Sequence, residues 1–423
     1  MVTNKEQNKL NVPHLRFPEF EGEWEKCKLG ELAVKVGSGS TPKGGNAVYT
    51  TSGHCFVRSQ NVGMGHLILN DIAYIDESTH QKQKSTELRT NDVLLNITGA
   101  SIGRTALATE EINGGNVNQH VCIIRTNSNV EPSYICDYIQ TSKIQKYIQS
   151  LQTGGSREGL NFEQIRSFPI NIPTVEEQVK IAKLLSLINE RIATQSKLIE
   201  DLKKLKSAII EIEYTPDDKY SCPLLLYSIS IIADLQATKS LIKGLAHHCI
   251  RDFTNDCEYV RLGDISKITT GKLDANAQVE NGQYPFFTCA ERPFNIDSYA
   301  FDTEALLISG NGANLGYINY YKGKFNAYQR TYVLDHFSVN IQYLKWALKV
   351  LLPQRIAIEK SSSNTPYIVL STLADLKIPI LNISKQNRIA NLMMSFERKL
   401  SNQLALSDLY YKQKQYLLRQ MFI

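Results

Sequence analysis

Apolar residues recur at alternating steps of three and four along two long stretches of the chain, residues 175–211 and 384–422. This heptad spacing is typical of a helix that buries one stripe against another helix. A helix of about 36 residues is roughly 54 Å long at 1.5 Å per residue, which is too long for a small domain to cover its stripe. The pattern therefore predicts that the two helices pack on each other. The expected seam consists of Ile181, Leu185, Ile188, Ile192, Ile199 and Leu202 in the first helix and of Ile389, Met393, Phe396, Leu400 and Leu417 in the second.

Polar residues interrupt this stripe at a few positions. Gln195 and Lys206 lie in the seam of the first helix, and Gln403 lies at a related position of the second. A buried polar residue can set the register of a coiled coil, whereas a partly exposed glutamine has no such role, and both interpretations remain open. Thr174 is the expected N-cap of the first helix, and Glu176–Glu177 follow in the first turn, where the helix dipole favours acidic groups.

The remainder of the chain has a different pattern, with short β-prone runs separated by glycine, asparagine and serine. Such runs predict sheets with many exposed loops, so the fold class is α/β (α+β) with two globular domains in tandem. Loops on a rigid sheet are where recognition residues usually lie. The predicted strands are 33–36, 55–58, 66–69, 93–97 and 121–125 in the first domain and 260–262, 284–288, 305–309, 317–321 and 331–334 in the second.

The two halves of the chain are copies of one unit. Three segments align in order: Lys28–Leu32 with Arg261–Ile265, Thr98–Gly103 with Asn311–Gly316, and Ile165–Ile210 with Leu373–Leu418. The last pair is related by a shift of 208 residues without a gap, and the apolar positions keep their phase throughout. The copies differ most between the first and second segments. A duplicated framework with divergent inserts is expected when each copy recognises a different target.

Composition and charge narrow the class of protein. The chain has 423 residues, of which 42% are hydrophobic and 21% charged, so it is neither collagenous nor disordered nor a small disulfide scaffold. The net charge of +5 equals that of residues 384–423, which hold seven Lys or Arg against two acidic residues. A basic helix favours nucleic acid or an acidic partner, but a solvated helix face has the same composition, and both interpretations remain open.

The sequence also predicts a cytoplasmic protein without a metal site. No stretch is long and apolar enough to span a membrane, and the N-terminus lacks the apolar core of a signal peptide. The eight cysteines are scattered, and none form the C-x2-C pairs typical of zinc sites. The nearest cluster, His247-His248-Cys249 with Cys257, is more simply interpreted as idle thiols in a reducing compartment.

Catalytic motifs are missing, so no catalytic residues are predicted. There is no P-loop, and Gly310–Gly316 has the wrong spacing for a dinucleotide-binding loop, so we interpret it as a structural turn. Asn364-Thr-Pro-Tyr367 lacks the first proline of the tetrapeptide that marks adenine-amino methyltransferases. Together with the repeat, this favours a binding protein over an enzyme.

The predicted loops carry side chains suited to DNA. Arginine pairs with guanine and asparagine or glutamine with adenine in a major groove, while lysine, serine and backbone amides suit phosphates. The candidates in the first half are Ser40, Thr41, Lys43, Arg58, Gln60, Asn61, Arg104 and Arg157, and those in the second are Lys272, Arg292, Asn311, Asn314, Gln329 and Arg330.

In the order of its sequence segments, the whole chain resembles a specificity subunit of a Type I restriction–modification system. The matching segments are Trp24–Glu31, the Gly-x-Thr-Pro-like Gly39–Lys43, the pair Asn118-Gln119, the run from Leu160 to Gln178, and Lys412–Phe422. The resemblance covers nearly the full length, and the order of these segments is more specific than any one of them.

The resemblance implies two target-recognition domains, each reading half of a split site in double-stranded DNA, held apart by an antiparallel pair of helices. It implies docking of two modification subunits, which carry S-adenosylmethionine and methylate adenine, and of two restriction subunits, which carry ATP and Mg. This chain would bind no cofactor itself. The alternatives are a stand-alone DNA methyltransferase or nuclease, which would need a cofactor motif, and a coiled-coil scaffold that does not bind DNA.

The expected domains are 1–23 (N-terminal segment), 24–174 (first recognition domain), 175–258 (helical spacer and connector), 259–383 (second recognition domain) and 384–423 (C-terminal helix). The second copy departs from the first at Ser384-Lys385-Gln386, where the first has Glu176-Glu177-Gln178, and at Ser362-Ser363, where it has Gly154-Gly155. A further helix over 236–252 is expected to complete the spacer.

Overall fold

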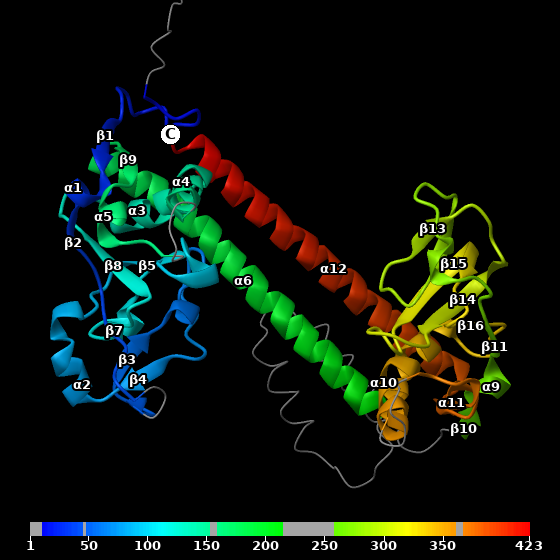
Figure 1. Cartoon of the computed structure of the whole chain (residues 1–423). Coiled ribbons are helices and arrows are strands. Elements are labelled where there is room, and N and C mark those ends of the chain that lie inside the picture. The colour runs from blue at the N-terminus through cyan, green and yellow to red at the C-terminus, as the bar shows by residue number, and fades with distance from the viewer. Residues whose placement is uncertain (1–10, 45–47, 153–158, 215–257, 361–366) are drawn as a thin grey trace, which may run out of the picture. The chain divides into compact units, whose positions relative to one another are not determined.

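The computed structural model describes residues 11–44, 48–152, 159–214, 258–360 and 367–423 (Figure 1). The chain divides into two compact units. Unit 1 comprises residues 1–196 and 405–423, and unit 2 comprises residues 197–404. Each unit therefore combines one globular domain with part of both long helices. The expected helix over 236–252 and the His247–Cys257 cluster lie outside the described residues.

The globular part of unit 1 is built on a four-stranded antiparallel sheet in the order β2-β8-β5-β6. One face packs on helices through Val93, Leu95 and Ile124, and the other packs on a second sheet through Leu94 and Ile123, because successive side chains of a strand point to opposite faces. The strands are β2 (Ala33–Ser38), β8 (Val121–Thr126), β5 (Val93–Asn96) and β6 (Thr105–Leu107), with β4 (Ala73–Ile75), β3 (His54–Val57) and β7 (Asn116–Val117) in the second sheet.

Short helices complete unit 1, and the pattern of apolar residues predicted none of them. Figure 1 shows α3, α4 and α5 near the start of the long helix and α2 beside the smaller sheet. Their bounds are α1 (Leu29–Leu32), α2 (Glu77–Lys82), α3 (Pro132–Ile139), α4 (Ser142–Gln152) and α5 (Phe162–Arg166).

The predicted strand at 66–69 is wrong. Only Leu67 forms an isolated bridge, with Val62, because the backbone here closes a tight turn in which Gly63 N–H donates to the carbonyl of His66.

Unit 2 contains a six-stranded sheet in the order β11-β16-β14-β15-β12-β13. The strands are β11 (Lys267–Thr270), β16 (Thr331–Asp335), β14 (Phe301–Ser309), β15 (Ile318–Ala327), β12 (Tyr284–Phe287) and β13 (Phe294–Ile296). Leu306 and Ile308 of β14 pack on helix α10 (Ile341–Lys360), and Ala305 and Leu307 pack on the opposite face with Phe325. The smaller helices are α9 (Leu262–Ile265) and α11 (Leu370–Ala374).

The repeat is visible as the same supporting ribbon in each unit. β1 (Glu25–Lys28) pairs with β9 (Pro169–Ile172), and β10 (Glu258–Arg261) pairs with β17 (Lys377–Ile380), both antiparallel. The Leu-Gly-acid start of each copy forms the helical turn after the first strand of this ribbon. Leu29 and Leu262 are fully buried there, and their amides donate to Phe168 and Leu376 at 2.9 Å each. The tandem fold inferred from the sequence is therefore confirmed.

The two long helices are α6 (Val175–Tyr214) and α12 (Ile383–Gln420). In unit 1 the end of α12 shares a core with the beginning of α6, so the helices run antiparallel there. All the seam positions proposed for α6 are buried, as are Ile389, Met393 and Leu417, while Phe396 and Leu400 are half-buried. Gln195 is also buried and Gln403 is half-buried. The Thr174 hydroxyl accepts from the Glu177 amide at 3.4 Å, as expected of an N-cap.

Candidate nucleic-acid interface

Three loops of unit 1 meet at one edge of its main sheet. They are the loop after β2, the turn Thr98–Gly103 after β5, and the loop between β7 and β8. Thr41 N–H donates to the amide oxygen of Gln119 at 2.9 Å, and the Thr98 hydroxyl lies 2.6 Å from Nδ1 of His120. The structure therefore brings the candidate Thr41 beside Gln119, whose side chain lies 3.1 Å from His120, and neither Gln119, His120 nor Thr98 was predicted to contact DNA.

A glycine in each unit allows this close approach of loops. A Cβ atom on Gly39 would overlap the carbonyl oxygen of Val117, and one on Gly271 would overlap that of Ala327. Gly39 belongs to the Gly-x-Thr-Pro-like segment noted in the sequence. The structural match with Gly271 shows that unit 2 holds its loop in the same way, although no such segment is recognisable there.

The corresponding loops of unit 2 also converge. Gln329 N–H donates to the carbonyl of Leu273 at 2.9 Å, and its side-chain amide donates to Asp274 Oδ1 at 2.9 Å. The Asn311 amide oxygen accepts from Cys289 Sγ at 3.0 Å, and Asn314 Nδ2 donates to the Cys289 carbonyl at 3.0 Å. The Arg330 carbonyl accepts from the Gly310 amide at 2.8 Å, which places Arg330 beside this turn, and its side chain is exposed.

Backbone contacts establish which positions of the two units correspond. The amide of Asn118 donates to Val57 at 3.0 Å, and that of Tyr328 donates to Phe287 at 2.9 Å. Thr98 forms an isolated antiparallel β-bridge with Gly159, and Asn311 forms the same kind of bridge with Tyr367. We call these paired loops the loop edge of each unit. Its paired positions are Thr98 with Asn311, Ser101 with Asn314, Gln119 with Gln329, and His120 with Arg330.

One candidate is excluded by its environment. Asn61 is 1% exposed, and its side chain bonds only to backbone groups. Its amide nitrogen donates to Ile68 at 2.9 Å and to Asp71 at 3.3 Å, and its oxygen accepts from Arg58 N–H at 3.0 Å. The proposal that Asn61 contacts DNA is therefore corrected, because this side chain stabilises the loop from inside.

Arg58 and Gln60 are held by the same loop. The Arg58 guanidinium bonds to the Asp71 carboxylate at 3.2 Å and lies 5.5 Å from the Tyr49 ring, and the Gln60 amide also bonds to Asp71. Any DNA contact of Arg58 or Gln60 would have to replace its bond to Asp71, so these two candidates are weaker than residues without an acidic partner.

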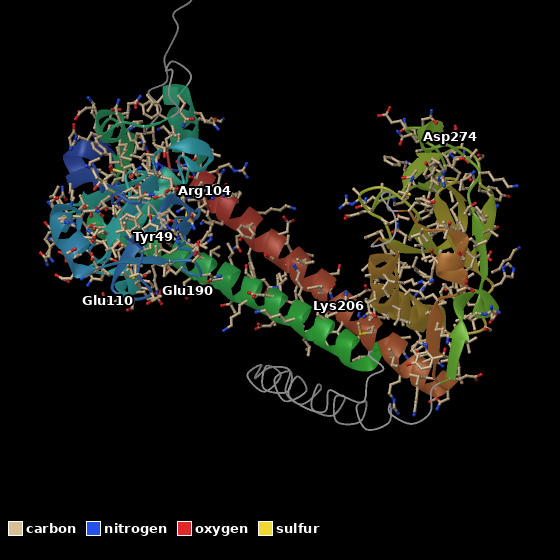
Figure 2. All side chains as sticks on the ribbon, turned by 60° about the horizontal axis from the view of Figure 1, so that its bottom comes forward. Tyr49, Arg104, Glu110, Glu190, Lys206 and Asp274 are labelled. Atoms are coloured by element: carbon tan, nitrogen blue, oxygen red, sulfur yellow. The ribbon has the colours of Figure 1, made fainter. Side chains whose placement is uncertain are left out.

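The remaining candidates divide by exposure. Ser40, Lys43 and Arg104 of unit 1 are exposed, and Figure 2 shows Arg104 on the surface of that unit. Lys272 and Arg292 of unit 2 are exposed as well. Arg157 lies outside the described residues.

Two lysines at equivalent positions of the long helices have buried partners that the sequence did not indicate. Lys414 is 6% exposed and donates to Gln140 Oε1 at 2.8 Å, while Gln140 Nε2 donates to Asp137 at 3.1 Å. Burial raises the pKa of Asp137 to about 7 and lowers the pKa of Lys414.

In unit 2 the equivalent Lys206 (labelled in Figure 2) lies 4.7 Å from the ring centre of Trp346 and 3.7 Å from the Glu397 carboxylate. Lys345 and Lys349 contact the same carboxylate at 3.3 and 3.5 Å. Burial lowers the pKa of Lys349. Lys414 of α12 thus contacts the C-terminal end of α3, whereas Lys206 of α6 contacts α10, so the two equivalent lysines have different partners.

The described residues contain no group of three or more His, Cys, Asp or Glu side chains arranged to hold a metal ion. Among the helices described, none has the length and apolar character needed to cross a membrane. What the described part does contain is a duplicated sheet edge with unlike polar side chains at matching positions. The two units therefore present the same backbone framework with different side chains at its edge.

Comparisons with known proteins show the family of the chain. The chain belongs to the family described as the Type I restriction modification DNA specificity domain, whose profile matches residues 21–204 and 254–406. It is similar to the Type I restriction enzyme EcoDI specificity subunit of Escherichia coli, with 44% identity over 135 residues, which is 32% of this chain and 30% of that protein. It is also similar to a putative type I specificity subunit of Mycoplasma genitalium, with 21% identity over 72% of this chain and 74% of that protein.

Solved structures share the fold. The S subunit of a Type I restriction–modification system from M. genitalium has a TM-score of 0.64 at 18% identity, covering 97% of this chain and 99% of that one. A chain from a study of assembly and conformational transition of the type I R-M system has a TM-score of 0.52 at 17% identity, covering 94% and 97%. The resemblance inferred from the sequence is thus confirmed, and the chain is a Type I restriction–modification specificity subunit.

Proposed function

We propose that each unit reads one half of a split site in double-stranded DNA through its loop edge. The observation that carries this proposal is the pairing of loop positions between the units. The same backbone contacts present Thr98 and His120 in unit 1 but Asn311 and Arg330 in unit 2. Side chains with different donors and acceptors select different bases, so two unlike half-sites are expected.

The long helices fix the gap between the half-sites in this proposal. α6 has 40 residues, so it is about 60 Å long at 1.5 Å per residue. Dimer spacing sets half-site separation in other DNA readers in the same way. Removing four residues within 188–202 alters the gap or abolishes modification, while the two half-site sequences stay the same. An unchanged gap in an active complex would contradict this role of the helices.

The chain acts within a larger assembly and supplies no catalytic group. Two modification subunits carry S-adenosylmethionine and methylate adenine, and two restriction subunits carry ATP and Mg. Because the substrate is cellular DNA, the assembly works in the cytoplasm. This proposal is supported by membership of the specificity-subunit family and by the missing catalytic motifs.

Exchange of one domain tests the two-reader proposal. Residues 24–160 are replaced by the corresponding section of a relative, and the chain is expressed with its modification subunit. Methylation mapping is expected to show one altered half-site and one unaltered half-site. A change in both half-sites would refute independent reading. Purified chain that binds S-adenosylmethionine alone would instead indicate a stand-alone enzyme, and a complex that binds no DNA would indicate a scaffold.

A further inference from the structure

One tight turn of the loop edge in unit 2 is fixed by backbone hydrogen bonds. The turn is Tyr328–Thr331, and the Thr331 amide closes it by donating to the Tyr328 carbonyl at 2.8 Å. Three neighbouring segments also bond to its backbone. These bonds run from Tyr328 N–H to Phe287 at 2.9 Å, from Gln329 N–H to Leu273 at 2.9 Å, and from Gly310 N–H to Arg330 at 2.8 Å. The backbone that carries the Arg330 side chain is therefore held in place.

The Arg330 side chain leaves this turn without a partner in its own chain. It is exposed, and no oxygen of the described residues accepts a hydrogen bond from its guanidinium group. Asp274, which Figure 2 shows near one end of unit 2, bonds to the Gln329 side chain at 2.9 Å. The guanidinium group is therefore available to a ligand, while the backbone beneath it stays fixed.

The equivalent turn of unit 1 presents no such group. His120 stands at the position of Arg330, and both of its ring nitrogens lie against side chains of unit 1. Nδ1 of His120 is 2.6 Å from the Thr98 hydroxyl oxygen, and Nε2 is 3.1 Å from Nε2 of Gln119. The same backbone turn thus carries an unpaired cation in unit 2 and a hydrogen-bonded ring in unit 1.

The covalent geometry of a guanidinium group decides which base edge it fits. Its N–H groups lie in one rigid plane, two of them parallel and adjacent, and they can only donate. In a major groove guanine offers two neighbouring acceptors, N7 and O6, whereas adenine offers one acceptor and one donor. An unpaired arginine on a fixed turn therefore favours guanine over the other three bases.

A phosphate group also accepts two parallel N–H bonds, but phosphate contacts carry no sequence information. Such contacts do not require unlike side chains in the two units, whereas Arg330 stands at a position where the units differ. Lys272 fits a phosphate better, because it is an exposed point charge next to Leu273, which bonds to the same turn.

We propose that Arg330 is a specificity-determining residue of unit 2 and that it recognises a guanine in one half-site. This inference rests on the proposed reading of DNA by the loop edge, and it names the residue and the base. Because His120 stands at the equivalent position of unit 1, loss of the Arg330 side chain changes recognition of one half-site and leaves the other unchanged.

Titration of DNA duplexes with the complex of this chain and its modification subunit tests the inference. The duplexes carry each base pair in turn, or 7-deazaguanine in place of guanine, at every half-site position. Arg330→Ala is expected to remove the preference for guanine at one position only, which a bidentate contact sets at about 5- to 150-fold. At that position 7-deazaguanine is expected to weaken binding of the unaltered complex, because N7 is lost, and to have no further effect on Arg330→Ala.

Lys272→Ala is the matched control, because it removes the same charge from a neighbouring loop. It is expected to weaken binding of every duplex by the same factor. The slope of log K against log salt concentration is expected to become shallower by about 0.9, as for one lost phosphate contact.

Two outcomes of this titration overturn the inference. Equal weakening of every duplex by Arg330→Ala would assign the guanidinium group to a phosphate oxygen rather than to a base. Unchanged binding in Arg330→Ala would show that this side chain contacts no DNA. An unaltered complex that binds all duplexes equally would instead refute the proposed reading of DNA, so the two failures are distinguishable.

Discussion

Two glutamines at equivalent positions allow a prediction with an internal control. Gln178 and Gln386 are 1% and 3% exposed at the starts of α6 and α12. Gln178 accepts from the Glu131 amide at 2.9 Å and donates to the Pro173 carbonyl at 2.9 Å. Gln386 accepts from the Asn340 amide at 2.9 Å and donates to the Leu381 carbonyl at 2.7 Å. Gln178 thus ties α6 to the start of α3, and Gln386 ties α12 to the start of α10.

Gln178→Met keeps the length of the side chain but removes both hydrogen bonds. Two largely buried backbone groups lose their partners at about 1–3 kcal/mol each, and the apolar side chain recovers part of this. The free energy of opening in unit 1 is therefore expected to fall by about 2–5 kcal/mol. Gln386→Met is expected to do the same in unit 2.

Hydrogen exchange measured by mass spectrometry separates the two effects. Peptides covering residues 127–140 are expected to lose protection in Gln178→Met, and peptides covering residues 336–349 are expected to lose protection in Gln386→Met. Each variant serves as the control for the other. Faster exchange of both regions in either variant, or of neither region, would refute the reasoning that the two hydrogen-bonded ties act locally.

Three further predictions concern charge and packing. Arg16 bonds to the buried Glu177 carboxylate through Nε and Nη2 at 2.8 Å each. Arg16→Met leaves this charge without a partner, so the free energy of unfolding measured in urea is expected to fall by about 3–5 kcal/mol. Adding Glu177→Gln to the Arg16→Met chain should recover part of this loss. Burial raises the pKa of Asp137 to about 7, whereas in the unfolded chain this carboxyl group loses its proton near pH 4. The protonated group therefore stabilises the folded chain at low pH, and this contribution is lost as the pH rises from about 4 to 7. The free energy of unfolding in urea should fall less between pH 5 and pH 8 in Asp137→Asn than in the unaltered chain. An equal fall in both would contradict the raised pKa of Asp137. Gly39→Ala should displace the loop after β2, seen as faster exchange of residues 37–44, whereas Gly37→Ala, where a Cβ meets no atom within 4 Å, should not.

The framework could be predicted from the sequence because it depends on periodicity. The heptad phase predicted the long helices, and the repeat predicted two domains in tandem, but not the ribbon that supports each of them. The strand proposed at 66–69 failed because a short apolar run does not reveal that a turn at Gly63 uses its backbone hydrogen bonds. Likewise, Lys206 and Lys414 lie in the seam, but their partners come from helices distant in sequence.

The candidate site was predicted only in part, because side-chain chemistry does not reveal contacts. Thr41 was identified from its loop, yet His120 was not, since its role depends on Thr98, which lies 22 residues away. Asn61 was proposed as a DNA contact because its amide suits adenine, but its partners are backbone groups brought together by folding. Glu177 was interpreted through the helix dipole, whereas Arg16 is its main partner.

The most direct experiment asks whether this chain directs methylation to a split DNA site through two readers. Methylated adenines are mapped across the genome of cells that carry the modification subunit, with and without this chain. We expect methylation that depends on the chain, at two short half-sites separated by a fixed gap. Methylation at a single continuous site, or no new methylation when both proteins are expressed and purify as a complex, would contradict it.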